Sequence, residues 1–195
     1  MKDNKPVWHE CYFGGAFNPI HYGHIEAALE AQNTLRKPVV LLPSGNPPHK
    51  QNLIPFIHRY KMCELVAQHY NFKVSKAEQG TTPTPTINTL RNLVPDFENY
   101  LVPFLVGTDS IQNLHTWIEP DALSKNVLWV VAPRGNAPIE NPKLKLNVLT
   151  LKSPPIDVSA TMIRQLVQKR DYNTLKKYLP DYVLDYIIQL RLYHE

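Results

Sequence analysis

The sequence predicts an α/β protein in which a doubly wound, Rossmann-like parallel sheet is followed by a helical C-terminal extension. Short apolar runs alternate with stretches whose apolar residues recur at helical spacing, and this alternation is typical of parallel sheets with right-handed crossovers. After Pro154 and Pro155 only helical patterns follow. The chain of 195 residues has the size of one domain, so we expect a single domain over 1–195, with its helical part at about 156–195.

Apolar runs mark the predicted strands. The clearest is KPVVLLPS at 37–44, because a continuous apolar run is typical of a strand that is buried on both faces. The predicted strands cover residues 7–13, 37–44, 72–76, 101–107, 126–133 and 147–151.

Helical spacing of apolar residues marks the segments between the strands. In the last segment, Val183, Tyr186, Ile187 and Leu190 follow the i, i+3, i+4, i+7 pattern, and Pro180 suits a first-turn position. The predicted helices cover 24–35, 57–70, 86–94, two short pieces within 108–125, 159–170 and 180–193.

Composition narrows the class of protein. The chain is 43% hydrophobic and 19% charged, as in ordinary globular proteins. Its net charge of +4 weakly favours anionic ligands, but its basic residues form no dense stripe, so we expect no nucleic-acid partner. The chain has no signal-peptide pattern and no apolar run of 18 residues, and its two cysteines, Cys11 and Cys63, suit reduced core thiols. We therefore expect a cytoplasmic protein that binds no membrane.

The segment GGAFNPIHYGH, residues 14–24, lies between the first predicted strand and the first predicted helix. In open parallel sheets, ligands bind outside the carboxyl ends of the strands. Gly14 and Gly15 allow the backbone to approach a ligand closely or to adopt a positive φ. The N-terminus of the following helix favours a phosphate, so this loop is a candidate phosphate site.

Two histidines take the place that a lysine has in other phosphate loops. The segment is neither a P-loop nor a dinucleotide fingerprint. His21 and His24, three residues apart at a helix start, can direct both rings at one spot. In the alternative interpretation, one ring caps the loop and the other packs in the core. A zinc site with His9 or Cys11 is a second alternative, but the spacing matches no standard zinc motif, so we expect no protein-held metal.

The segment GGAFNPIHYGH resembles the signature of the nucleotidyltransferase superfamily. The resemblance extends over the whole chain, because further motifs follow in the order found in bacterial nicotinate-mononucleotide adenylyltransferases. These motifs are PPHK (47–50), TPTINTL (84–90), GTDSIQNLHTW (107–117), DVSATMIR (157–164) and YLPDYVLDYI (178–187).

The resemblance implies an enzyme that transfers the adenylyl group of ATP to nicotinate mononucleotide. The products are deamido-NAD and pyrophosphate. In this family the 5′-phosphate of the mononucleotide attacks the α-phosphorus of ATP directly, so no nucleophilic side chain is needed. The implied partners are ATP and nicotinate mononucleotide, and Mg²⁺ is expected to arrive with the triphosphate.

The resemblance also implies which residues form the site. His21 and His24 hold the reacting phosphates, and Arg164 grips the pyrophosphate that leaves. The other implied residues bind ATP or the mononucleotide, and they are Gly14, Gly15, Phe17, Asn18, Lys50, Thr86, Gly107, Asp109, Trp117, Ser159 and Thr161.

Several of these residues have an alternative structural role. Asp109 accepts hydrogen bonds from a ribose diol or caps a helix, and Trp117 stacks on the pyridine ring or packs in the core. Ser159 binds phosphate or acts as an ordinary N-cap. Lys50, beside His49, assists the incoming phosphate or lies in a solvated loop. Thr86 and the backbone near Trp117 are implied to bind the nicotinate carboxylate.

Two positions depart from the family pattern. Asn18 stands where bacterial members commonly have Asp, and Pro85 replaces an aromatic residue before Thr86. The second departure leaves open an adenylyltransferase that prefers nicotinamide mononucleotide. A pantetheine-phosphate adenylyltransferase and a non-catalytic nucleotide-binding regulator are further alternatives, and the sequence leaves homo-oligomer formation open.

Overall fold

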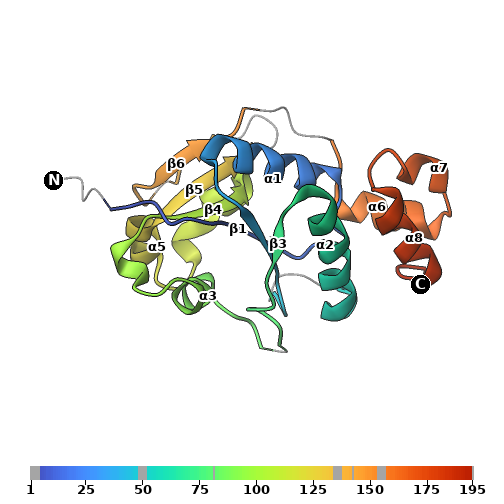
Figure 1. Cartoon of the computed structure of the whole chain (residues 1–195), viewed down its shortest axis with the longest axis horizontal. Coiled ribbons are helices and arrows are strands. Elements are labelled where there is room, and N and C mark those ends of the chain that lie inside the picture. The colour runs from blue at the N-terminus through green and yellow to red at the C-terminus, as the bar shows by residue number, and fades with distance from the viewer. Residues whose placement is uncertain are drawn as a thin grey trace.

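A computed structural model of the chain describes residues 5–47, 52–80, 82–133, 138–141, 143–152 and 157–194. Its centre is a six-stranded sheet in the order β3-β2-β1-β4-β5-β6, in which every neighbouring pair is parallel (Figure 1). The doubly wound parallel sheet predicted from the sequence is confirmed. The strands are β1 (Cys11–Gly15), β2 (Val39–Pro43), β3 (Lys73–Val74), β4 (Val102–Gly107), β5 (Val127–Ala132) and β6 (Asn147–Thr150).

Strand β1 lies further along the chain than the predicted strand 7–13. It begins at Cys11, whereas Val7 makes only an isolated bridge to Leu101. At its other end it includes both glycines of the loop motif, which pair with Leu42 and Pro43 of β2. The prediction ended the strand before the glycines. Strands pair through backbone N–H and C=O groups, however, so glycines need not interrupt the pairing.

The helices agree with the predicted segments except near 170 and at the C-terminal end, where the last helix ends at Gln189 and not at 193 as predicted. The predicted helix 159–170 ends at Gln168, and a separate short helix follows, capped by Asp171, whose side chain accepts a hydrogen bond from the Thr174 N–H at 3.2 Å. The α-helices are α1 (Tyr22–Leu35), α2 (Phe56–Tyr70), α3 (Thr86–Leu93), α4 (Thr108–Asn113), α5 (Pro120–Asn126), α6 (Ala160–Gln168), α7 (Tyr172–Leu175) and α8 (Asp181–Gln189). Two 3₁₀ turns, η1 (Phe97–Asn99) and η2 (Leu114–Thr116), complete the described elements.

Apolar side chains cover both faces of the sheet. Along β2, Val39 and Leu41 belong to one buried cluster, whereas Val40 and Leu42 belong to the other. The first cluster includes residues of α1, α2 and α6–α8, and the second includes residues of α3, α4 and α5. Successive strand residues point to opposite faces, so a strand that is buried on both sides becomes apolar throughout.

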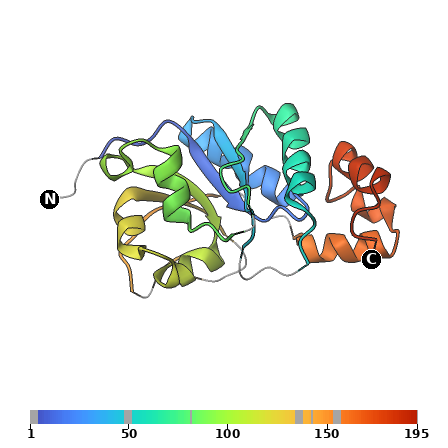
Figure 2. The same ribbon diagram turned by 90° about the horizontal axis from the view of Figure 1, so that it is seen from below.

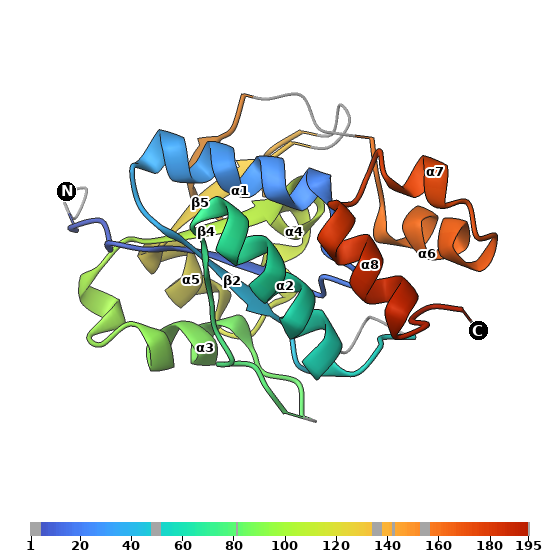
Figure 3. The same ribbon diagram turned by 45° about the vertical axis from the view of Figure 1, so that its right-hand side comes forward.

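The helical C-terminal part packs against the side of the sheet that carries α1 and α2. Helices α6–α8 lie at the end of the molecule opposite the N-terminus (Figures 1 and 2), and α8 lies beside α2 (Figure 3). Two His–Tyr pairs join these helices: His58 Nδ1 lies 3.0 Å from the Tyr186 hydroxyl, and the rings of His69 and Tyr182 stack at 3.9 Å. Across the described residues, no helix has both the length and the apolar composition of a membrane span.

The tight contact at Gly14 generates a test of the packing. A Cβ at Gly14 would lie 2.8 Å from the buried ring of Phe104, whereas a Cβ at Gly80 would meet nothing within 4 Å. We expect Gly14→Ala to lower the free energy of unfolding by about 1–3 kcal/mol, because the ring must move to accept the methyl group. Urea denaturation measures this, with Gly80→Ala as the control that stays within about 0.5 kcal/mol. Equal midpoints for the two variants would contradict the packing described here.

Candidate active site

A cavity of about 490 Å³ opens at the carboxyl edge of the sheet. It lies where β1 and β4 diverge, which is the point at which the strand order reverses. Ligands of doubly wound sheets bind at such points. Eleven of the residues singled out from the sequence line this cavity: Gly14, Gly15, Phe17, Asn18, His21, His24, Gly107, Asp109, Ser159, Thr161 and Arg164.

Three of the predicted site residues are not among the cavity lining. Lys50, like His49, lies outside the described residues. Thr86 opens α3, and Trp117 follows η2 and packs edge-on against the buried ring of Trp129, with 5.9 Å between ring centroids. The structure therefore gives Trp117 a packing contact, as in the alternative interpretation, while leaving it partly exposed.

His21 and His24 stack on each other at the start of α1. Their ring centroids are 3.7 Å apart, and His24 Nδ1 accepts a hydrogen bond from the His21 N–H at 3.3 Å. His21 is the N-cap of α1 and is almost fully buried. Because His24 Nδ1 accepts, the neutral ring carries its proton on Nε2 and is a hydrogen-bond donor there. One pair of histidines thus caps the helix and lines the cavity at the same time.

Aromatic packing explains why this loop contains two glycines. A Cβ on Gly15 would lie 3.0 Å from the ring of Phe17, just as a Cβ on Gly14 would meet Phe104. The positive φ of the loop belongs to Phe17, at 45°, and neither glycine has one. Of the two reasons offered for the glycines, positive φ is therefore wrong. The Phe17 ring packs edge-on against His24, at 5.2 Å between centroids, and so restrains the imidazole.

The carboxyl end of β4 also borders the cavity. Gly107 is the N-cap of α4, and a Cβ there would meet nothing within 4 Å, so the absence of a side chain leaves open volume in the cavity. Asp109 lies in the first turn of α4 with its side chain exposed, and no side-chain hydrogen bond caps this helix. The carboxylate is thus exposed to the cavity, and the alternative role as a helix cap is not observed.

The start of α6 supplies the third side of the cavity. Ser159 is the N-cap, since its hydroxyl accepts a hydrogen bond from the Met162 N–H at 3.1 Å. Arg164 Nη2 donates to the Thr161 hydroxyl at 3.2 Å, and Nη1 donates to the Asn18 carbonyl oxygen at 2.8 Å. Arg164 therefore joins the C-terminal helices to the histidine loop.

The side chain of Asn18 is hydrogen-bonded within the protein. It is 3% exposed, its Nδ2 donates to the Asn52 carbonyl at 3.2 Å, and its Oδ1 accepts from the Ile54 N–H at 3.4 Å and from the Tyr193 hydroxyl at 3.0 Å. An Asp, the common family residue, could not donate to Asn52 when ionised.

Arg59 is a site-forming residue that the sequence interpretation missed. It is 1% exposed, and burial lowers its pKa. Its guanidinium donates to four backbone carbonyls, those of Ile54 (3.1 Å), Ala16 (2.8 Å), Ser44 (2.6 Å) and Gly45 (2.9 Å). An arginine at the spacing of the buried helix positions 62, 63 and 66 was the available signal.

Glu26 and Glu30, one turn apart on α1, also line the cavity and were missed. Glu30 accepts a hydrogen bond from the Lys152 N–H. Among the described residues, no group of three or more His, Cys, Asp or Glu side chains could hold a metal ion.

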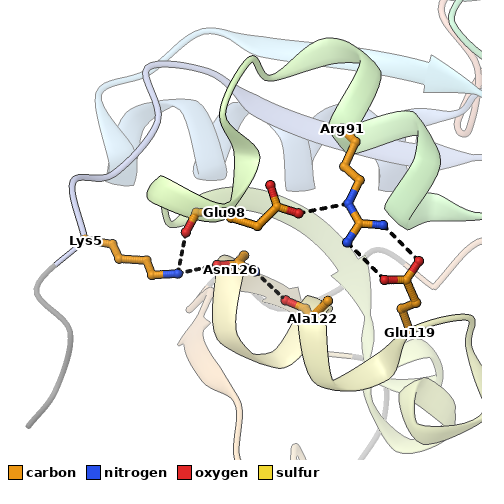
Figure 4. A network of polar contacts seen from close by, with 6 residues as sticks. All are labelled: Lys5, Arg91, Glu98, Glu119, Ala122 and Asn126. Atoms are coloured by element: carbon orange, nitrogen blue, oxygen red, sulfur yellow. Dashed lines mark hydrogen bonds and ion pairs between the residues drawn. The ribbon is translucent and has the colours of Figure 1, made fainter.

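A polar network ties the segment of Trp117 to the helix of Thr86. From α3, Arg91 donates to both carboxylate oxygens of Glu119, at 2.8 and 3.0 Å, and to Glu98 at 2.9 Å (Figure 4). Lys5 joins the same region by bonding to the Glu98 carbonyl at 2.6 Å and to Asn126. These contacts fix α3 relative to the segment 117–119 on the side of the sheet opposite α1.

Three kinds of comparison with known proteins match this chain over most of its length. Residues 12–166 match the cytidylyltransferase-like family. A probable nicotinate-nucleotide adenylyltransferase of Synechococcus sp. (strain JA-2-3B'a(2-13)) is 34% identical over 92% of this chain and 94% of its own length. A probable nicotinate-nucleotide adenylyltransferase of Tropheryma whipplei (strain TW08/27) is 32% identical over 92% of this chain and 97% of its own length. Plasmodium falciparum nicotinic acid mononucleotide adenylyltransferase complexed with NaAD has the same fold, with a TM-score of 0.73 at 24% identity over 96% of this chain and 97% of that one.

Arg59 generates a stability test with a control on the same helix. We expect Arg59→Met to lower the free energy of unfolding by at least about 3 kcal/mol, because four backbone carbonyls lose a charged donor. Lys61→Met breaks only the exposed ion pair to Glu64 and should cost about 0.5 kcal/mol or less. Urea unfolding followed by circular dichroism measures both. Similar losses for the two variants would show that the Arg59 contacts add nothing.

Proposed function

The chain belongs to the cytidylyltransferase-like family and, within it, to the nicotinate-nucleotide adenylyltransferases, and on this premise we propose which residues carry the reaction. The reaction transfers the adenylyl group of ATP to nicotinate mononucleotide and releases pyrophosphate. The observation that carries our assignment is the convergence of His21, His24 and Arg164 on one cavity, from segments far apart in the sequence.

The triphosphate of ATP binds between the histidine loop and α6. The 5′-phosphate oxygen of the mononucleotide forms a bond to the α-phosphorus, and the bond from that phosphorus to the β-phosphate oxygen breaks. The attacking oxygen is already ionised, so the reaction needs positioning and charge stabilisation rather than a general base. His24 donates from Nε2, Arg164 supplies a fixed positive charge, and the N-terminus of α1 adds its dipole.

The nucleoside of ATP binds along β4 and β5. Asp109 accepts hydrogen bonds from the ribose diol, and the open volume above Gly107 admits the sugar. The adenine lies against the apolar part of the lining, formed by Ala132, Pro133 and Leu151. Ser159 and Thr161 face the β- and γ-phosphates.

The pyridine ring binds near Thr86 and Trp117, outside the cavity but on segments held together by Arg91 and Glu119. The N-cap of α3 is Pro85, whose side chain has no acceptor and so does not compete with a ligand for the first N–H groups of this helix. A carboxylate suits that position better than an amide, and this supports nicotinate over nicotinamide mononucleotide.

Mg²⁺ is the metal we assign to the reaction, bound through ATP. The carboxylates that line the cavity are Glu26, Glu30 and Asp109, and they form no all-protein cage among the described residues. This fits a cation held mainly by phosphate oxygens and water. The cation would neutralise charge on the leaving pyrophosphate.

We also propose a single domain and a cytoplasmic location. One buried cluster runs from β1 through α2 to α8, which supports one folding unit. Cys11 and Cys63 are buried free thiols, as suits a reducing compartment.

The assay of the wild-type protein and of His24→Ala tests the central assignment. We expect ATP, Mg²⁺ and nicotinate mononucleotide to yield deamido-NAD and pyrophosphate, and the variant to lose about 10²–10³-fold in kcat, because one preorganised donor is removed. Coupled pyrophosphate release measures the rate. His9→Ala is the control, since this residue is exposed and lies outside the cavity. A folded His24→Ala variant with full turnover would refute the role of the imidazole.

The variants Thr86→Ala and Trp117→Ala test the proposed binding site of the pyridine ring. Each should raise the KM for nicotinate mononucleotide about tenfold, through a lost hydrogen bond or lost stacking, while the KM for ATP stays within about twofold. Parallel assays with nicotinamide mononucleotide should show a preference of the wild type for the acid of at least about tenfold. A preference for the amide, or equal changes in both KM values, would contradict this assignment.

A further inference from the structure

One hydrogen bond links the C-terminal segment after α8 to the histidine loop. Tyr193 is 9% exposed, and its hydroxyl donates to Asn18 Oδ1 at 3.0 Å. Its backbone is left-handed, with φ at 64°, a conformation that costs free energy in a residue with a side chain. Tyr193 is not among the residues that line the cavity, but Asn18, which accepts its hydrogen bond, is one of them.

Asn18 links Tyr193 to the cavity, because it accepts the tyrosine's hydrogen bond and also lines the cavity. Its amide has one orientation, because Nδ2 donates to the Asn52 carbonyl while Oδ1 accepts from Tyr193 and from the Ile54 N–H. Its backbone carbonyl accepts from Arg164 Nη1 at 2.8 Å. The C-terminal part thus contacts one residue of the loop twice, once through a phenol and once through the guanidinium that lines the cavity.

We propose that Tyr193 is a positioning residue for adenylyl transfer, which through Asn18 fixes the separation between the histidine pair and Arg164 that a triphosphate requires. This inference rests on the proposed function. Without the phenol, Oδ1 keeps only the 3.4 Å bond from Ile54, and the loop that carries His21 can shift relative to α6. Displacements of about 1 Å at positioning groups cost up to about 10² in rate.

The Tyr193 phenol keeps its proton, and so remains a hydrogen-bond donor, at neutral pH. Burial raises the pKa of its phenol far above the usual range, although Arg164 and Arg59 nearby oppose the shift. The contact therefore holds the loop without titrating.

Tyr186 provides a matched control. Its hydroxyl is hydrogen-bonded to His58 Nδ1 at 3.0 Å, so it too ties the C-terminal helices to the rest of the protein through one phenol. Neither Tyr186 nor His58 lines the cavity or contacts Asn18 in any hydrogen bond described for that residue. Tyr193→Phe and Tyr186→Phe therefore remove the same group from two different contacts.

Steady-state kinetics and calorimetry test the proposal. We expect Tyr193→Phe to lower kcat about tenfold and to raise the Kd of inorganic tripolyphosphate about fivefold, with the KM for nicotinate mononucleotide within about twofold. Tyr186→Phe should change none of these by more than about twofold. In a double-mutant cycle, Tyr193→Phe and Arg164→Lys should be non-additive in kcat, because both side chains hydrogen-bond to Asn18.

Three results would overturn the proposal. These are equal effects of the two Phe variants, additive effects of Tyr193→Phe and Arg164→Lys, or unchanged tripolyphosphate affinity in Tyr193→Phe. A wild type that binds tripolyphosphate but forms no deamido-NAD would instead defeat the proposed function, and the affinity comparison would still decide whether Tyr193 positions the polyphosphate groups.

Discussion

The buried guanidinium of Arg59 is the interaction on which the candidate site depends. Arg59 is only 1% exposed, so its positive charge must be stabilised by groups inside the protein. Backbone carbonyls provide this stabilisation in place of a carboxylate. The four acceptors belong to two connections: Ala16 follows β1, whereas Ser44, Gly45 and Ile54 lie near the two ends of the connection between β2 and α2. One side chain thereby fixes the relative positions of segments that have little regular structure of their own.

Asn18 continues this framework toward the substrates. Its side-chain amide is hydrogen-bonded to the segment before α2, and its backbone carbonyl accepts a hydrogen bond from Arg164. The side chains that we assign to ATP binding are therefore held in place by residues that do not themselves contact the nucleotide. Catalysis by positioning requires such support, because no covalent step compensates for a misplaced donor.

Most of the fold followed from local patterns, whereas most of the candidate site residues followed from the family resemblance. Strand and helix alternation predicted the parallel sheet, and the loop 14–24 lies at its carboxyl edge as expected. The contacts of Arg59, Tyr193 and Asn18 could not be predicted, because each joins segments that only the tertiary fold brings together. The packing reason for Gly14 could not be predicted either, because only the tertiary fold brings the Phe104 ring against it.

The hydrogen bond from Arg164 to Asn18 spans 146 residues of sequence. During translation, a nascent chain that has emerged through β5 already carries both imidazoles but still lacks the guanidinium. The anion site that we propose is therefore complete only after α6 has been synthesised and has packed beside the loop that carries the histidines.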